Sequence, residues 1–587
     1  MRYQFTFLFC GCFAALQGQS LHVHPFVSYG GTALEYTKAM IGNMAYDGIG
    51  KRTLLEQYPE SWADAATTTT VPVSAGAATD AFGLLLPKQE RGALWSRLRL
   101  GGQVDVLGNI AGYAQYQFQK YNWAQQHKTH ATFRQPRDLN RNGWSDYQAG
   151  NRLYTLHSWR YSRRLHRYFL DAGYFHNRLF GGDKNFRFGN SGPLYGFSTN
   201  MNHWQASLKG EQNFSRTEAS MLYWNVQFSR HHQQRALGVW QYEGLENRLT
   251  ASVEVARKWG QYQQWTLGLQ GWYHQLCESA NTFRHTPTDK GLRLTSAYTT
   301  PVLGFFLAKM SLSADKRATQ SWLLLPTMQL DWALGNEQPL FLSAYFNSGR
   351  RMVRPLEYHL DWLATASGFQ YRATPFETAW RYGLNLSHGG VGRSALWKVR
   401  LDRCHFGHKA LLRRAADGQT LEWYSAVEPL RLSSVEGMFN SKVSQLQWHA
   451  IYRWEHWGPS GHIPFQAAHA AQARLRYTLS GKGALSAHYT VKSPQDLKSV
   501  RLSQMPPQTA VYQRLDLALQ LYLNQLLSFK KNYRSLQLNL YCDNAPQLFG
   551  RKHRALEYGL LLFPETGEKV WSDPVMGNLR LELVWEL

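Results

Sequence analysis

Alternation of apolar and polar residues with a period of two recurs along most of this chain and limits its fold more than any other feature. Successive side chains of a β-strand point to opposite faces, so this pattern predicts strands with one apolar and one polar face. In the C-terminal segment LRLELVWEL, charged residues alternate with an apolar set. That set is Leu579, Leu581, Leu583, Trp585 and Leu587.

The same pattern returns in other parts of the chain. Leucines alternate from Leu515 to Leu523, which favours a strand over a helix between Thr509 and Leu527. Residues 473–479 lead through Ser480-Gly481-Lys482-Gly483 into residues 485–491, which predicts a hairpin with a short turn. Near the front, alternation from Ile110 to Phe118 predicts a further strand.

These strands are expected to close into a membrane barrel. A water-soluble β-sandwich would also alternate, but three features favour a barrel: an export signal, strands of about ten residues, and short turns alternating with long polar connections. Closure also removes the free edges of so large a sheet. We therefore predict an all-β chain, with a large transmembrane antiparallel β-barrel over residues 90–587 in the outer membrane.

The N-terminus has the pattern of a cleaved signal peptide over residues 1–19. Arg2 supplies a positive charge, and the apolar run from Phe5 to Leu16 is too short to span a bilayer. Two alternatives are a buried N-terminal element and a lipoprotein anchored at Cys12. If the signal is removed, Cys277, Cys404 and Cys542 remain, an odd and widely spaced set that implies neither a disulfide framework nor a zinc site.

The composition fits a barrel and argues against a nucleic-acid-binding protein. Aromatic residues make up 14% of the chain and charged residues only 18%, as expected where Trp and Tyr gather at two membrane interfaces. The formal net charge is +24, but Lys and Arg are spread along the chain and no nucleic-acid-binding motif accompanies them. Lipopolysaccharide phosphates or an anionic ligand are the expected partners of these charges.

Four segments, in order, resemble TonB-dependent outer-membrane receptors. Residues 31–88 are similar to the second half of the receptor plug, and five residues carry the match: Gly31, Tyr36, Leu55, Gln57 and Pro59. DLNRNGWSDY, residues 138–147, resembles an Asp- and Asn-rich loop early in the barrel. Residues 346–389 resemble a mid-barrel loop and its following strand, with matches at Glu377, Trp380, Tyr382, Gly383 and Leu384. Trp571, Pro574 and Gly577 match the step into the last strand.

The resemblance implies a barrel of about 22 strands, preceded by a plug remnant over residues 20–89. It also implies binding or uptake of a nutrient such as a metal chelate, haem or cobalamin. No TonB-binding segment is recognisable, so coupling to TonB is not predicted. A degenerate barrel that serves as a structural or complex subunit, and a passive pore, stay open as alternatives.

One loop has the spacing of a calcium site. Asp138, Asn140, Asn142 and Asp146 place oxygen ligands at alternate positions around Gly143, a pattern that suits Ca²⁺. Ala149 stands where a bidentate Glu is expected. A polar turn rich in Asn and Asp is the alternative interpretation.

A second loop is basic and aromatic and is the candidate ligand-binding site. Its residues are Arg350, Arg351, Arg354, Tyr358 and His359. Such a cluster could hold an anionic metal chelate through charge-assisted hydrogen bonds and stacking. The alternative is a loop that faces solvent or lipopolysaccharide.

The 22 histidines are dispersed in the sequence, and none lies in a ligand triad of known spacing. Pairs occur at His127 and His130 and at His231 and His232. No Ser-His-Asp order, paired carboxylates or phosphate-binding loop is present, so an enzyme is not predicted.

Overall fold

The protein is described from a computed structural model. It describes residues 95–106, 108–120, 122–135, 144–163, 165–183, 197–214, 220–237, 240–259, 263–280, 283–302, 306–317, 322–334, 340–352, 368–373, 376–388, 395–418, 420–426, 428–458, 468–494, 496, 498–499, 511–526, 535–543, 545, 560–562, 569–571 and 578–586. The predicted signal peptide, residues 1–19, and the predicted plug remnant, residues 20–89, lie outside this described part.

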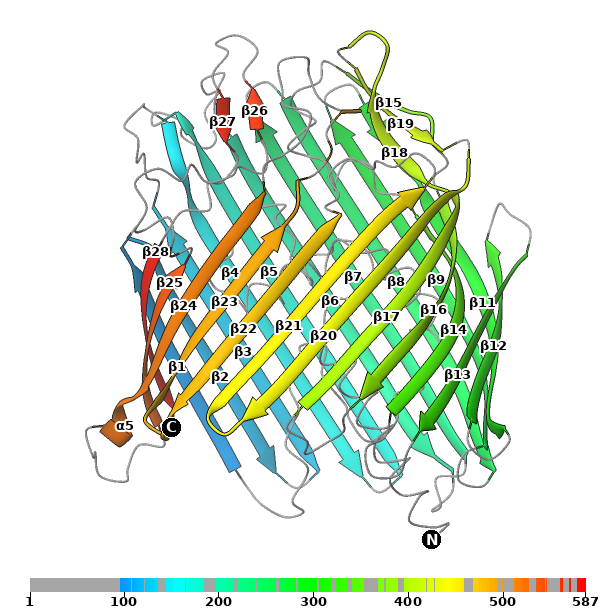
Figure 1. Cartoon of the computed structure of the whole chain (residues 1–587), viewed down its shortest axis with the longest axis horizontal. Helices are drawn as coiled ribbons and strands as arrows, with labels where there is room; N and C mark the ends of the chain where they lie inside the picture. The colour runs from blue at the N-terminus through cyan, green and yellow to red at the C-terminus, as the bar shows by residue number, and fades with distance from the viewer. Residues whose placement is uncertain are drawn as a thin grey trace.

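Long tilted strands form a single closed wall (Figure 1). The first half comprises β1 (Trp95–Asp105), β2 (Ile110–Lys120), β3 (Trp123–Arg134), β4 (Trp144–Arg163), β5 (His166–Asp183), β6 (Phe197–Asn213), β7 (Ser220–Leu237), β8 (Trp240–Trp259), β9 (Gln263–Ala280), β11 (Thr288–Val302) and β12 (Phe306–Arg317). The second half comprises β13 (Leu323–Leu334), β14 (Leu340–Met352), β16 (Phe376–His388), β17 (Ala395–His408), β20 (Leu430–Val443), β21 (Leu446–Gly458), β22 (His469–Leu479), β23 (Gly483–Lys492), β24 (Tyr512–Tyr522), β25 (Ser535–Asp543) and β28 (Asn578–Glu586).

Closure comes from the first and last strands. β1 pairs antiparallel with β2 on one side and with β28 on the other, with Gly102 opposite Leu583. Every backbone edge of the barrel is thereby paired, as a lipid environment requires. The predicted all-β, 22-stranded antiparallel barrel is confirmed.

Short elements lie at the two ends of the barrel. The small sheet of β15 (Gly368–Tyr371), β18 (Ala410–Arg414) and β19 (Thr420–Ser425) lies at the top of Figure 1, as does the pair β26 (Leu560–Leu562) and β27 (Lys569–Trp571). β10 (Phe283–His285) extends the barrel sheet beside β9. At the bottom, the one-turn helix α5 (Leu523–Leu526) follows β24, and Ser444 and Gln445 alone join β20 to β21. We call these the loop end and the turn end.

The two faces of the wall differ as the alternation predicts. Large apolar side chains are exposed on the outer face; Leu579, Leu581 and Leu583 are each more than 40% exposed. Between them, Glu582 is 5% exposed and points into the lumen. An exposed apolar outer band with a polar interior is the surface of a membrane-spanning barrel. None of the described residues belongs to a helix long and apolar enough to cross a bilayer.

Details of the predicted strands also hold. The alternation from Ile110 to Phe118 lies in β2, and the alternating leucines from Leu515 to Leu521 lie in β24. The predicted strand is wrong at its end, because Leu523 begins the one-turn helix α5. The predicted hairpin is β22–β23, where Gly481 has a φ of 79° in the turn. The predicted strand length of about ten residues is too short for several strands. β4 and β8 each have 20 residues, about twice what a tilted strand needs to cross a bilayer.

Candidate functional site

The lumen wall formed by β11 to β21, here called the ion-pair wall, carries charged side chains that face one another across neighbouring strands. Arg293 in β11 makes a two-pronged contact with Asp315 in β12, and its Nη2 lies 2.7 Å from Oδ2. Lys309 Nζ lies 3.4 Å from Asp331 Oδ2 in β13. Buried charges that are paired and hydrogen-bonded in this way are tolerated, whereas isolated ones are not.

Farther round the same wall, one carboxylate serves two arginines. Asp402 in β17 pairs with Arg381 of β16 and lies 3.2 Å from Arg400 Nε. Arg400 Nε also donates to the Tyr345 hydroxyl at 2.9 Å. Gly383 makes this packing possible, since a Cβ there would lie 2.6 Å from Asp402 Oδ1 and 2.7 Å from the Tyr345 hydroxyl.

Arg453 in β21 completes the ion-pair wall. It lies 3.0 Å from Glu455 and 3.7 Å from Glu436, and its own side chain is 2% exposed. The positive charges on this side of the lumen are therefore largely neutralised by carboxylates of the same wall.

The opposite part of the lumen, from β3 to β8, has a different chemistry. The strand register places six lumen-facing residues in one row, here called the imidazole row. From β3 to β8 they are His130, Tyr154, Phe175, His203, His231 and Glu246. Tyr154 and Phe175 also belong to a buried apolar cluster with Leu156 and Met201.

Two histidines lie at the centre of the imidazole row. The ring centroids of His203 and His231 are 5.8 Å apart, and the two side chains are 2% and 6% exposed. Both ring nitrogens of His203 are buried without a hydrogen bond of normal geometry among the described residues, and Gln205 on the same strand is a weak side-chain partner. Glu246, opposite His231, accepts from His274 Nε2 at 2.5 Å.

No pattern in the sequence indicated this row. His203 and His231 are far apart in the chain, and only the register between β6 and β7 sets them opposite one another. The available signal was weak: each lies at a lumen-facing position of an alternating strand.

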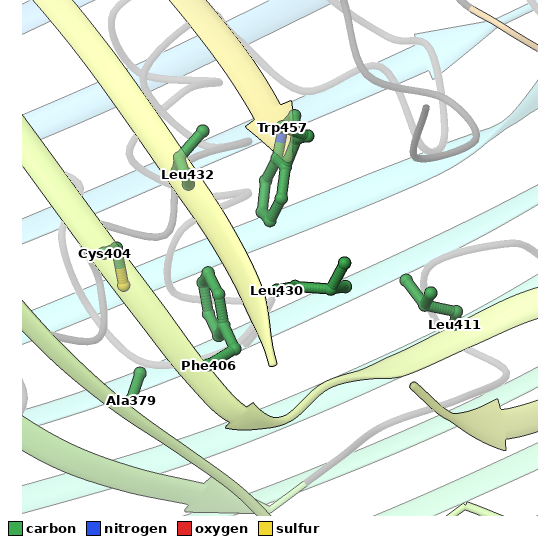
Figure 2. Packing of buried hydrophobic residues seen from close by; sticks show 7 residues of the cluster. All are labelled: Ala379, Cys404, Phe406, Leu411, Leu430, Leu432 and Trp457. Carbon is green, nitrogen blue, oxygen red and sulfur yellow. The ribbon is translucent and has the colours of Figure 1, made fainter. Parts of the chain in front are cut away.

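At the loop end, an apolar cluster fastens the small sheet to the barrel wall. Phe406 of β17, Leu430 and Leu432 of β20 and Trp457 of β21 are at most 5% exposed, and Leu411 of β18 packs among them (Figure 2). Burial of side chains of this size contributes roughly 1.5–3 kcal/mol each. The small sheet is therefore a fixed part of the mouth.

A second contact joins the small sheet to the β9–β11 connection. The His285 ring lies 4.3 Å from that of Tyr371, and Phe283 stacks near Trp423. Burial lowers the pKa of His285 to about 4, so this ring is neutral in the docked state. Within the small sheet, the buried Glu422 pairs with Arg413 and Arg372.

The predicted ligand-binding residues lie partly within the described chain. Arg350 and Arg351 are near the loop end of β14, opposite Thr378 and Glu377 of β16. Arg354, Tyr358 and His359 lie outside the described residues. The strand β16 follows this loop, as the resemblance to the mid-barrel loop and strand of the receptors implies. Its Trp380 and Tyr382 face outward.

The predicted calcium ligands are also only partly described. Asp146 lies in β4, where the register with β5 is irregular between Ser145 and Ala149. The strand thus begins inside the segment predicted as loop. Asp138, Asn140 and Asn142 lie outside the described residues. Among described residues, no group of three or more His, Cys, Asp or Glu side chains is placed to hold a metal ion.

Known proteins match this chain in structure only. No family model matches the sequence, and no curated protein does. A mutant of the ferric enterobactin receptor PfeA from Pseudomonas aeruginosa matches with a TM-score of 0.60 and 11% identity, over 85% of this chain and 81% of that one. BauA, the ferric preacinetobactin receptor from Acinetobacter baumannii, matches with a TM-score of 0.59 and 12% identity, over 84% and 80%.

The copper transporter OprC matches to the same degree, with a TM-score of 0.61 and 10% identity over 85% of this chain and 81% of that one. These neighbours are TonB-dependent receptors and transporters of the outer membrane. At such low identity the matches establish the fold. The described part of this chain therefore has the barrel fold of the TonB-dependent outer-membrane receptors.

Proposed function

We propose that this protein is an outer-membrane receptor that binds a small nutrient ligand at its loop end and admits it through the lumen. The observation that carries the proposal is the closed barrel whose lumen is lined by polar, charged and imidazole groups. Its fold is shared with receptors whose names specify ferric siderophores and with a copper transporter. Those names make a metal-containing ligand the first class to test.

The loop end supplies the initial contact in this proposal. Arg350 and Arg351 begin the basic and aromatic segment that continues to Arg354, Tyr358 and His359. Arginine forks suit the carboxylates or catecholates of an anionic chelate. Calcium binding by the segment from Asp138 to Asp146 is a separate proposal, tested by the effect of a chelator on ligand affinity.

Two experiments test the receptor function. The protein should fractionate with outer membranes and migrate faster on an unheated gel than on a heated one; recovery in the soluble periplasmic fraction would contradict it. Titration of the purified barrel with a ferric catecholate, haem or cyanocobalamin should quench the tryptophan fluorescence of the protein. The double variant R350A/R351A should weaken this binding. R257A is the matched control and should not, since Arg257 lies toward the turn end of β8.

The outcomes separate the alternatives. Accumulation of the ligand by cells, dependent on the proton gradient, supports uptake and rejects a purely structural barrel. Conductance in planar bilayers without any ligand binding would instead identify a passive pore.

A further inference from the structure

We propose that His203 and His231 bind a transition-metal ion of the copper class inside the lumen. The site would accept the ion as cargo on its way through the barrel. This inference deepens the proposed uptake function and rests on it, because it names the metal class and the place of contact. The two histidines are supplied by adjacent strands, β6 and β7, at directly paired positions.

The distance between the rings suits one shared ion. A metal bound at about 2.0 Å by an imidazole nitrogen lies about 3.2 Å from the ring centroid. Two imidazoles on the same ion therefore have centroids roughly 5–6.4 Å apart. The observed separation of 5.8 Å lies in this interval, and the ring planes meet at 52°. Small changes of side-chain rotamer can direct one nitrogen of each ring at a common point.

The state of His203 points to a missing ligand. It is 2% exposed, and neither of its ring nitrogens makes a hydrogen bond of normal geometry among the described residues, where Gln205 on the same strand is only a weak side-chain partner. A buried imidazole left in that state costs roughly 1–3 kcal/mol. An apolar side chain beside Phe175 and Met201 would make the barrel more stable than histidine does. A bound ion would offset the cost of burying the imidazole.

The surroundings favour a soft or borderline cation. Met201, two residues before His203 on the same lumen face, supplies a thioether that is 3% exposed. Imidazole and thioether donors select copper over calcium or magnesium. Glu246, opposite His231 in β8, lies next to the pair, but its charge is already paired with Arg248 and His274. The preference for a metal class therefore comes from the imidazole and thioether donors.

The small number of protein ligands fits a passing ion. The described residues provide no set of three or more His, Cys, Asp or Glu side chains around one point. Two imidazoles and a thioether leave coordination positions for water or for a ligand carried by the ion. A site on a transport path must bind strongly enough to admit the ion and weakly enough to release it.

The test uses the full-length protein, purified in detergent and titrated with Cu²⁺ by calorimetry, with electron paramagnetic resonance as the second measurement. We expect H203A and H231A each to weaken the tightest copper site at least about tenfold. The matched control is H232A, next to His231 in sequence; that side chain contacts Glu243 at an exposed position. H232A should leave the tightest site unchanged.

The resonance spectrum covers the case in which the variants fold poorly. With one equivalent of Cu²⁺, the wild-type protein should show coupling to two imidazole nitrogens. Coupling to one nitrogen or none, or copper affinities of folded H203A and H231A equal to those of wild type, would overturn the site. Haem binding that is lost in both variants while copper binding is unchanged would overturn it as well.

These results are separable from the receptor function. Ligand uptake by cells, with copper binding insensitive to H203A and H231A, removes the metal site and leaves the receptor. Copper binding lost in both variants, in a protein for which no nutrient uptake is found, supports the site and removes the uptake function.

Discussion

The two sides of the lumen differ in whether their buried polar groups meet partners on the neighbouring strand. On the ion-pair wall, charged groups meet partners from the next strand, as Arg381 meets Asp402 and Arg453 meets Glu436 and Glu455. In the imidazole row, His203 is equally buried but makes no hydrogen bond of normal geometry among the described residues. The first wall holds its buried charges in ion pairs between neighbouring strands, whereas the second carries the two imidazoles proposed above as a metal site.

The largest effect is expected from breaking the ion-pair wall. D402A removes the carboxylate that serves Arg381 and Arg400 and leaves two largely buried guanidinium groups without it. Loss of one partner from such a buried group costs about 3–5 kcal/mol. The free energy of unfolding, measured by urea titration of the barrel in lipid vesicles, should fall by that amount. The double variant R381M/D402L should recover part of it, and a D402A barrel as stable as wild type would refute the role of these pairs.

A charge on the lipid face should cost less, and only on that face. Leu269 of β9 is 49% exposed on the outer wall, and its neighbour Gln270 faces the lumen. L269R should lower the free energy of unfolding in vesicles by about 2–4 kcal/mol, the cost of an arginine near the bilayer centre. Q270E, which places a charge on the lumen face opposite Arg293, is the control and should cost under about 1 kcal/mol. Equal costs at both positions would mean that the two faces of β9 do not differ in environment.

The imidazole row should respond in the opposite sense to the ion-pair wall. H203L removes a buried polar group that makes no hydrogen bond of normal geometry in the described chain and adds apolar contact with the Phe175 and Met201 cluster. The free energy of unfolding without metal should therefore stay unchanged or rise by about 1 kcal/mol. Destabilisation by more than about 2 kcal/mol would show that His203 has a structural partner.

The smallest effect concerns the contact between His285 and Tyr371 at the loop end. The folded pKa of about 4 lies below the usual 6.5, so the undocked state takes up protons first as the pH falls. Docking is fully stable above pH 6.5 and loses stability between pH 6.5 and 4. The amide protection factors of residues 283–285 and 368–371, which correct the exchange rates for the intrinsic effect of pH, should fall over this interval. H285F should remove the pH dependence; its persistence in that variant would assign it to another group.

The barrel was predictable from sequence because its physics is local. Alternation along LRLELVWEL requires two environments, and the structure places Leu581 outside and Glu582 inside. Turn residues such as Gly481 mark the hairpins in the same local way. Strand length was less predictable, since the long strands β4 and β8 continue beyond the span that a bilayer imposes.

The candidate site was less accessible to sequence reasoning. His203 becomes a neighbour of His231 only through the register of a hairpin, and a shift of one residue would turn the whole strand over. The small loop-end sheet depends on contacts between distant segments, as when Leu411 packs against Phe406 and Leu430. Neither arrangement leaves a spacing in the sequence that could be recognised.

The two-faced wall itself can be tested most directly on β7, which carries His231. Spin labels placed singly at residues 225–230, in the protein reconstituted in vesicles, report access to oxygen from the lipid and to a water-soluble nickel complex from the lumen. Val226 and Phe228, which are exposed on the outer face, should yield labels accessible to oxygen. Positions 225, 227 and 229 should yield labels accessible to nickel. Equal nickel access at all six positions would contradict a membrane barrel with a separate lumen.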